Sequence, residues 1–300
     1  MQMLNKLDYI KNNFLSDKEM YVSYSSKIKT GFSVIDSNLS IRPGVYLLGG
    51  IPSVGKTTLA VQLSDEFAKQ GNHVLFFSLE QSNYDLTNKS ISRIQHIVGN
   101  KRNEALAIYR LQYAENITTV ISHTSVSIED IKRVVAQYIN QFNIVPIVFV
   151  DYLQLIQTGF SPNKRDAVTY VSNQLVNISK EYNLTMFVLS SLNRTNYISP
   201  IDFESFKESG SLEYDADVVF GLQYQLMSNT NFLKCQSVDL KRVMFNNEKA
   251  ADVRKVELVC LKNRFGTTAF TCPLEYYANH DLFAEQIENK KKVTNKSQYI

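Results

Sequence analysis

Residues Gly49-Gly-Ile-Pro-Ser-Val-Gly-Lys-Thr-Thr58 decide the fold of this 300-residue chain. Positions 50–57 fit G-x-x-x-x-G-K-[ST], the sequence of a phosphate-binding loop. The apolar run 45–48 before the loop predicts a buried strand, and apolar residues at helical spacing follow the loop. Because strand, glycine loop and helix in this order are the context that the motif requires, we favour the loop over a glycine turn that matches by chance.

The residue types in this loop suit a chain of phosphate groups. Glycines at positions 50 and 55 let the backbone curl so that N–H groups point inward, and the helix N-terminus adds positive charge. Lys56 is expected to reach the β- and γ-phosphates, and the hydroxyl of Thr57 is expected to hold Mg²⁺. The predicted phosphate-binding residues are Gly50, Ser53, Val54, Gly55, Lys56, Thr57 and Thr58.

Composition limits the possible partners and compartments. The net charge is +3, and lysines 290, 291, 292 and 296 account for all of this excess. The body of the chain is therefore not a strongly basic nucleic-acid binder, and any such contact must be a local patch or a pore formed by several subunits. Cys235, Cys260 and Cys272 form no close pair, so neither a zinc site nor a disulfide framework is indicated. Without a signal-like or membrane-spanning run, we expect a cytoplasmic protein.

The hydrophobic pattern predicts strands that alternate with helices. Strands are expected at 45–48, 73–79, 146–151, 184–192 and 218–222, and helices at 83–98, 101–113, 127–142 and 166–182. The runs 256–261 and 268–273 read as a closing β-hairpin. This order favours an α/β fold with a mostly parallel sheet covered on both faces, which binds ligands beyond the C-terminal strand ends.

The predicted domain organisation has three parts. Residues 1–29 form an arm with a partly apolar helix at about 4–15, which packs on its own domain or on a neighbour. Residues 30–285 form the α/β domain, in which the polar stretch 226–252 is expected to be a flexible insertion or a disordered excursion. Residues 286–300 form a basic, disordered tail.

Acidic residues stand at the ends of two of the predicted strands. Asp151 follows four apolar residues and is expected to hold Mg²⁺ through water, the alternative being a helix cap. Glu80 closes Ser78-Leu-Glu80 and is the best candidate to polarise an attacking water. Because Gly50, Glu80, Asp151 and Ser191 all lie at such strand ends, they can meet at one site.

Six short motifs in a fixed order resemble the C-terminal ATPase domain of the DnaB-type replicative helicases. They are Thr30-Gly-Phe32, Ser78-Leu-Glu80, Asp151-Tyr-Leu-Gln-Leu155, Ser191-Leu-Asn-Arg194, Lys207-Glu-Ser-Gly-Ser-Leu-Glu213 with Asp215-Ala-Asp217, and Lys262-Asn-Arg264 before Phe265-Gly266. The resemblance extends over about residues 28–285, alongside the phosphate loop. It implies a RecA-like fold and the use of ATP and Mg²⁺.

The resemblance also implies roles for single residues. Lys56 and Thr57 would bind ATP phosphates and Mg²⁺, Glu80 would be the catalytic acid-base residue, and Asp151 the Walker B acid. Lys262 and Arg264 resemble the pair that reaches into the ATP site of the next subunit. Lys207, Glu208 and Gly210 match the loop that holds the backbone of single-stranded DNA. The chain departs from the family in having Ser191 where a γ-phosphate-sensing Gln is usual, and we expect it to lack the family's N-terminal domain.

The positions of the arginines in the sequence also favour this pairing across subunits. Hydrolysis by a phosphate-loop enzyme often needs an arginine near the γ-phosphate. No arginine stands out at the phosphate end of the loop strand or beside Asp151, and Arg42 precedes the strand and so lies toward its far end. We therefore expect Arg264 to act in trans, with Lys262 beside it, in an oligomer that is a hexamer.

Three functions remain open from the sequence. The first is a ring-forming ATPase that moves on single-stranded DNA and unwinds duplex. The second is a DNA-stimulated ATPase without unwinding activity, such as a helicase loader or recombination accessory. The third is a binding protein that uses ATP only to assemble. DNA-stimulated hydrolysis separates the first two from the third, and strand displacement separates the first from the second.

Overall fold

The computed structural model describes residues 10, 15–16, 28–122, 126–157, 164–193, 199–209 and 212–286. For residues 164, 165 and 207–209 it describes the backbone alone. The expectations for the arm helix at about 4–15 and for the basic tail therefore lie almost wholly outside the described residues.

In the described part of the chain, nine strands form one sheet in the order β11-β10-β9-β8-β1-β7-β5-β2-β3. The six that pair in parallel are β8 (Val218–Tyr224), β1 (Gly44–Gly50), β7 (Thr185–Ser191), β5 (Ile147–Asp151), β2 (Val74–Ser78) and β3 (Ile117–Ile121). The antiparallel strands are β9 (Val253–Asn263), β10 (Thr271–Tyr277) and β11 (Leu282–Glu285). The mostly parallel α/β sheet and its C-terminal hairpin are confirmed, and β3 and β11 are additions that the pattern did not predict.

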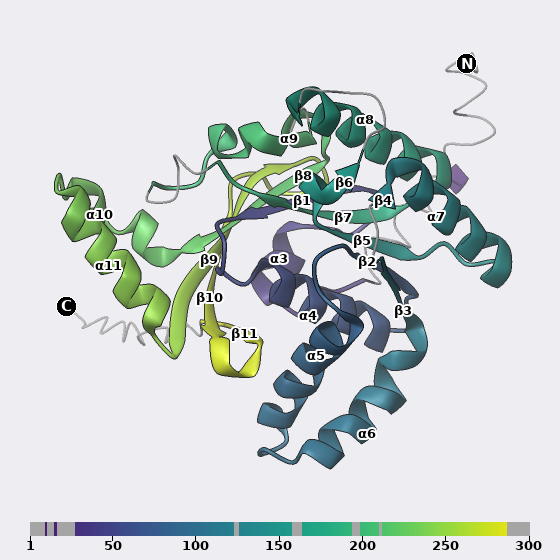
Figure 1. Cartoon of the computed structure of the whole chain (residues 1–300), viewed down its shortest axis with the longest axis horizontal. Helices are drawn as coiled ribbons and strands as arrows, with labels where there is room; N and C mark the ends of the chain where they lie inside the picture. The colour runs from purple at the N-terminus through teal and green to yellow at the C-terminus, as the bar shows by residue number, and fades with distance from the viewer. Residues whose placement is uncertain are drawn as a thin grey trace, which may run out of the picture.

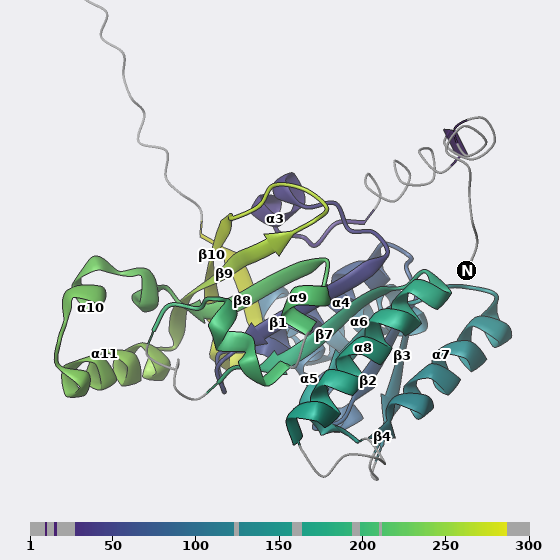
Figure 2. The ribbon, with the colours of Figure 1, turned by 90° about the horizontal axis from the view of Figure 1, so that it is seen from above.

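Helices cover both faces of this sheet (Figures 1 and 2). One face carries α3 (Ser33–Asn38), α4 (Lys56–Lys69), α5 (Asn83–Ile97) and α6 (Arg102–Gln112); the other carries α7 (Ile128–Phe142), α8 (Lys164–Tyr182) and α9 (Leu212–Asp215). A small parallel pair, β4 (Val126–Ser127) and β6 (Ile156–Gln157), lies near α7 and α8. Ser82 and Ser127 cap α5 and α7 in capping boxes, which satisfies backbone N–H groups at both starts.

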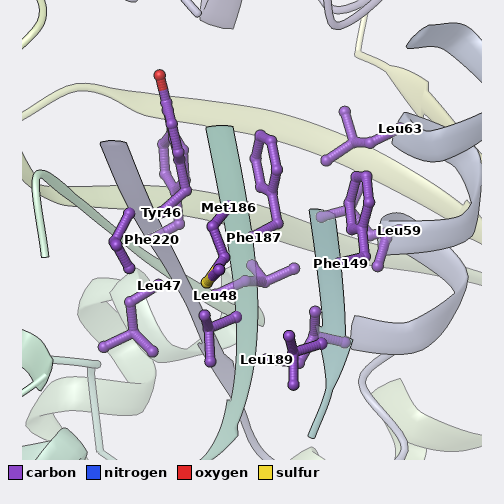
Figure 3. Close-up of a cluster of buried hydrophobic side chains, with 14 of the residues drawn as sticks. Tyr46, Leu47, Leu48, Leu59, Leu63, Phe149, Met186, Phe187, Leu189 and Phe220 are labelled. Carbon is purple, nitrogen blue, oxygen red and sulfur yellow. The ribbon is translucent and has the colours of Figure 1, made fainter. Parts of the chain in front are cut away.

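The core under α4 is built around a row of aromatic rings (Figure 3). Strand register places Tyr46, Phe187, Phe149 and Phe76 side by side on β1, β7, β5 and β2. Adjacent rings stack with centroids 4.6, 4.9 and 5.4 Å apart, and Phe67 of α4 packs on two of them. Each such pair adds about 0.5–1.5 kcal/mol beyond the area that it buries. This row fixes α4, and with it the phosphate loop, against the parallel strands.

The polar stretch 226–252 is helical, which differs from the expectation of a disordered excursion. It contains α10 (Thr230–Lys234) and α11 (Val238–Ala250), which begin at the capping residues Asn229 and Ser237. None of the residues of α11 is buried. The partly buried face of α11 contains only two apolar residues, Met244 and Phe245, and this weak pattern could not distinguish the helix from an irregular segment. Figure 1 shows both helices projecting from the body beside β9.

Two smaller observations complete the fold. Cys260 and Cys272 are buried in β9 and β10, as their apolar surroundings predicted. Among the residues that the structure describes, no helix is both long and apolar enough to cross a bilayer.

Candidate nucleotide site

The C-terminal ends of β1, β5, β2 and β7 meet around a polar cavity of about 630 Å³. Lys56, Thr57, Glu80, Asp151 and Ser191 all line this cavity. The structure therefore brings together the residues that the sequence placed at separate strand ends. A cavity at the carboxyl edge of a parallel sheet is the usual ligand site of this architecture.

The backbone of the loop needs glycine at position 55. Gly55 has φ 104°, and a Cβ there would lie 2.7 Å from the Phe283 ring and 3.0 Å from the Tyr276 ring. Ser53 is also left-handed, with φ 64°, and α4 begins directly afterwards at Lys56. Left-handed residues let successive N–H groups face one side, and the helix start adds its dipole. The loop therefore has the concave, N–H-lined form that binds phosphate.

Lys56 carries a positive charge that is partly removed from water. Its Nζ donates hydrogen bonds to the carbonyl oxygens of Gly50 (2.7 Å) and Ile51 (3.2 Å). Burial lowers its pKa to about 8, and the nearby carboxylates of Asp151 and Glu80 oppose this change. A phosphate anion in the cavity would raise the pKa again, because an opposite charge favours the protonated form. The side chain is thus suited to an anionic ligand.

Thr57 and Asp151 form the oxygen-rich part of the cavity. The Thr57 hydroxyl donates a hydrogen bond to Asp151 Oδ2 at 2.8 Å. Burial raises the pKa of the Asp151 carboxyl to about 6, and the Thr57 hydrogen bond partly offsets this. Within the ranges that the structure describes, no cluster of three or more His, Cys, Asp or Glu side chains is arranged to hold a metal. One carboxylate and one hydroxyl fit Mg²⁺, which keeps several waters and shares its coordination with phosphates.

Glu80 and Ser191 lie at the ends of the neighbouring strands. Glu80 is exposed and lines the cavity two residues after β2, where the Leu79 N–H donates to the Asp151 carbonyl at 2.8 Å. Ser191 ends β7, and its N–H donates to Gln154 Oε1 at 3.3 Å. Gln154 also donates to the Ser190 hydroxyl at 2.9 Å. Position 191 therefore presents a short side chain to the cavity, beside a glutamine whose amide is engaged with β7.

Arg254 also lines the cavity, so the expectation that no arginine lies at the phosphate end is wrong. Its Nη1 donates to the Ser53 carbonyl at 3.2 Å, and its guanidinium lies 5.6 Å from the centre of the Tyr276 ring, its partner across β9 and β10. The residue was missed because β9 is antiparallel. The start of that strand therefore reaches the edge where the parallel strands end. The predicted hairpin already indicated a strand in this region, but its first strand was predicted to begin at residue 256, two residues after Arg254.

Arg264 and Lys262 lie at the opposite end of the sheet from the cavity of their own chain. Asn263 pairs with Val218 at the start of β8, whereas Arg254 lies at the cavity, so β9 separates the two arginines by about 30 Å at the usual rise of a strand. Arg264 Nη1 is 3.2 Å from Asp217 Oδ1 and half-exposed. Lys262 donates to the Tyr214 carbonyl, and burial, together with the charge of Arg264, lowers its pKa.

Arg264 directly follows β9, which is not an edge strand, because β10 and β11 extend the sheet further. Arg42 lies at the same far end, as expected, with its guanidinium 4.1 Å from the Phe265 ring centre and Nη2 donating to the Arg264 carbonyl at 3.2 Å.

Two of the three expected DNA-contacting residues lie in a short 3₁₀ segment, η4 (Phe203–Ser209). The backbone of Lys207 and Glu208 belongs to η4, and Gly210 lies outside the described residues. Because their side chains are not described, the contact with DNA stays a prediction.

Known proteins resemble this chain in sequence and in fold. The model of the DnaB-like helicase C-terminal domain matches residues 27–285. A probable replicative DNA helicase of Trieres chinensis is 27% identical over 278 residues, which cover 87% of this chain and 57% of that protein. The replicative DNA helicase DnaB of Mycoplasma pneumoniae is 25% identical over 265 residues, covering 80% of this chain and 53% of that protein. The chain thus spans about half the length of these curated relatives.

Solved structures share the fold. A solved ATPase domain superposes with a TM-score of 0.75 at 19% identity, covering 95% of this chain and all of that chain. A DnaB-like replicative helicase, solved in a study of its interactions with primase, has a TM-score of 0.73 at 20% identity, covering 92% of this chain and 68% of that chain. The RecA-like fold is thereby confirmed. With a family model that matches nearly the whole described body, the chain belongs to the DnaB-like helicase C-terminal domain family.

Proposed function

We propose that this protein is an ATP-hydrolysing helicase that works as a ring, which we expect to be hexameric, on single-stranded DNA in the cytoplasm. One observation carries the proposal. The loop, Thr57, Asp151 and Glu80 share a cavity that also contains Arg254 at the start of β9, whereas Lys262 and Arg264 lie at the other end of β9, about 30 Å away. At that distance Arg264 and Lys262 cannot reach the nucleotide of their own chain. This separation supports a role for the pair in the nucleotide site of a neighbouring subunit.

In the proposed mechanism the residues of the cavity bind and orient ATP, and a neighbouring subunit supplies the remaining positive charge around the γ-phosphate. The N–H groups of the loop and Lys56 hold the phosphates, and Glu80 accepts the proton of the attacking water. Thr57 and Asp151 would hold Mg²⁺, which would neutralise charge on the phosphates when bound. Arg264 and Lys262 of the adjacent subunit would stabilise the negative charge that develops on the γ-phosphate. Hydrolysis at successive interfaces would then move the DNA-contacting segments relative to one another.

The proposed function is tested by measuring ATP hydrolysis with and without poly(dT), together with displacement of a labelled strand from a forked duplex. We expect DNA to stimulate hydrolysis and ATP to drive displacement. Stimulation without displacement would replace the helicase with a loader or recombination accessory. A rate of hydrolysis that does not depend on DNA would contradict both the helicase and the loader or recombination accessory.

Arg254 supplies the first variant prediction. Arg254→Ala should weaken nucleotide binding about tenfold to a hundredfold, because a charge-assisted hydrogen bond contributes roughly 1.5–3 kcal/mol. The measurement is the Kd of a fluorescent ATP analogue. Lys255→Ala is the matched control, since Lys255 is the next residue of β9, is exposed and does not line the cavity. Equal losses in the two variants would show that general charge, and not a contact with the nucleotide, is responsible.

Lys207 supplies the second variant prediction. Lys207→Ala should weaken poly(dT) binding, lower DNA stimulation and leave hydrolysis without DNA unchanged. Neutralising one phosphate contact should also reduce the dependence of log Kd on log salt by about 0.7 for a single strand. Fluorescence anisotropy at several salt concentrations gives both values.

Two controls belong to the Lys207 experiment. Lys249→Ala removes an exposed charge from α11, and truncation after Glu288 removes the lysines at 290–296, which are a rival source of affinity. An unchanged salt slope for Lys207→Ala, with a reduced slope for the truncation, would move the DNA contact from the loop to the tail.

A further inference from the structure

The segment 199–209, which contains η4 and Lys207, rests directly on β1, the strand that leads into the phosphate loop. Phe206, in η4, is fully buried. A Cβ on Gly49 would overlap with the Phe206 ring and would lie 2.9 Å from Leu192 Cδ2. The ring therefore occupies the space that a side chain at position 49 would need, and only glycine permits this contact.

A second apolar side chain of the segment lies against the neighbouring strand in the same way. Strand register places Gly221 of β8, Gly49 of β1 and Ser190 of β7 side by side. A Cβ on Gly221 would lie 2.5 Å from Ile201 Cγ2. Small residues on three adjacent strands thus form a flat floor, on which the segment sits with Phe206 over β1 and Ile201 over β8.

Hydrogen bonds anchor the segment to the sheet independently of the Phe206 ring. The Ile201 N–H donates to Gln223 Oε1 at 2.7 Å, and Gln223 Nε2 donates to the buried Glu257 carboxylate at 2.7 Å. The Asn193 N–H donates to the Ser205 carbonyl at 2.9 Å. These bonds hold the segment in place on β8 and β7. The Phe206 contact with Gly49 is therefore not needed simply to keep the segment attached.

The contact at Gly49 lies very close to Lys56. Gly49 is followed by Gly50, whose carbonyl oxygen accepts the 2.7 Å hydrogen bond from Lys56 Nζ. On the other side, Phe206 is followed by Lys207. One peptide unit and one hydrogen bond thus separate the Phe206 ring from the lysine of the phosphate loop. The side chain of Ser191 is short and its N–H is bonded to Gln154, so Ser191 does not provide an equivalent link from β7 to Lys56.

We propose that Phe206 is a positioning residue that transmits DNA contact at the end of η4 through Gly49 to Lys56. The proposal rests on the proposed function, since it assumes that DNA binds at these residues and stimulates hydrolysis. Movement of η4 on DNA binding would shift the ring, the Gly49–Gly50 backbone and the carbonyl that holds Lys56. The lysine would then be released toward the γ-phosphate.

The test compares DNA stimulation, the ratio of ATPase rates with and without saturating poly(dT), in four proteins. Phe206→Leu keeps an apolar side chain but leaves the space above Gly49 open, and its stimulation should fall about threefold to tenfold with unchanged basal rate and poly(dT) Kd. Gly49→Ala should lower the basal rate and the ratio, because the methyl group displaces the ring. In Gly49→Ala/Phe206→Leu, the methyl group fills the open space, and the ratio should recover toward wild type.

Ile201→Val is the matched control, because it trims a residue of the same segment that lies over Gly221. Its Tm should fall while its stimulation stays at the wild-type value. The proposal is overturned if Phe206→Leu keeps wild-type stimulation, or if Ile201→Val loses as much as Phe206→Leu. Absence of recovery in the double variant would also overturn it. A wild-type protein that DNA does not stimulate would refute the proposed function itself, and a loss of poly(dT) affinity in Phe206→Leu would assign the residue to DNA binding instead.

Discussion

Replacing Arg264 with alanine should reduce ATP hydrolysis by about three to five orders of magnitude, the usual contribution of an arginine supplied in trans to a phosphoryl-transfer site. The loss should appear in kcat and leave nucleotide binding unchanged, since the residue lies at the far end of β9 from its own cavity. The fold should survive, because the ion pair with Asp217 is half-exposed and such pairs contribute about 0–1 kcal/mol at most.

Two further variants sharpen the Arg264 result. Lys180→Ala removes another exposed charge from the same end of the sheet, next to Asp217 and Phe265, and should keep wild-type kcat. Arg264→Lys keeps the charge but not the planar fork of donors, so it should recover only part of the activity. Full activity of Arg264→Ala, measured at a concentration where the wild type is oligomeric, would remove this residue from catalysis.

Glu80→Gln should lower kcat by about two to four orders of magnitude, the range for loss of a general base. The substitution keeps the size and polarity of the side chain and removes only the carboxylate that accepts a proton. Lys56, Thr57 and Asp151 remain, so ATP binding should be retained. Single-turnover hydrolysis and the Kd of a fluorescent ATP analogue, measured on the same protein, separate the two effects.

Gln81→Ala serves as the control for Glu80→Gln, because Gln81 is the next residue, also lines the cavity and carries no proton-accepting group. It should change hydrolysis far less. Near-normal turnover in Glu80→Gln would instead assign the base to another group in the cavity.

Local patterns were enough to predict the centre of this site. The spacing of Gly50, Gly55 and Lys56 specifies a loop by itself, and Asp151 ends an uninterrupted apolar strand. In a parallel sheet such strand ends meet at one edge, so the convergence of these residues with Glu80 followed from the fold class alone. The structure places Gly55, Lys56, Glu80 and Asp151 in the lining of the cavity, and Gly50 lies next to it as the acceptor of a hydrogen bond from Lys56.

What the sequence did not reveal depends on contacts between distant segments. Arg254 reaches Ser53, about 200 positions away in the chain, only because β9 runs antiparallel to β8. The fit of Phe206 over Gly49 depends on the position of η4 above β1, and no periodicity encodes it. Nor does α11, whose partly buried face has only Met244 and Phe245 as apolar residues, differ clearly in hydrophobic pattern from an irregular segment. Each of these features requires tertiary placement.

Mixing two inactive proteins tests most directly whether neighbouring subunits share one active site. Arg264→Ala subunits keep Glu80, and Glu80→Gln subunits keep Arg264. With equal amounts and random assembly, about a quarter of the interfaces should combine an intact Glu80 with an intact Arg264 from the neighbour. We predict that hydrolysis returns on mixing, in proportion to that fraction, and varies with the mixing ratio. If subunit exchange is demonstrated by a labelled partner and the mixture stays as inactive as its components, the two residues do not act across an interface.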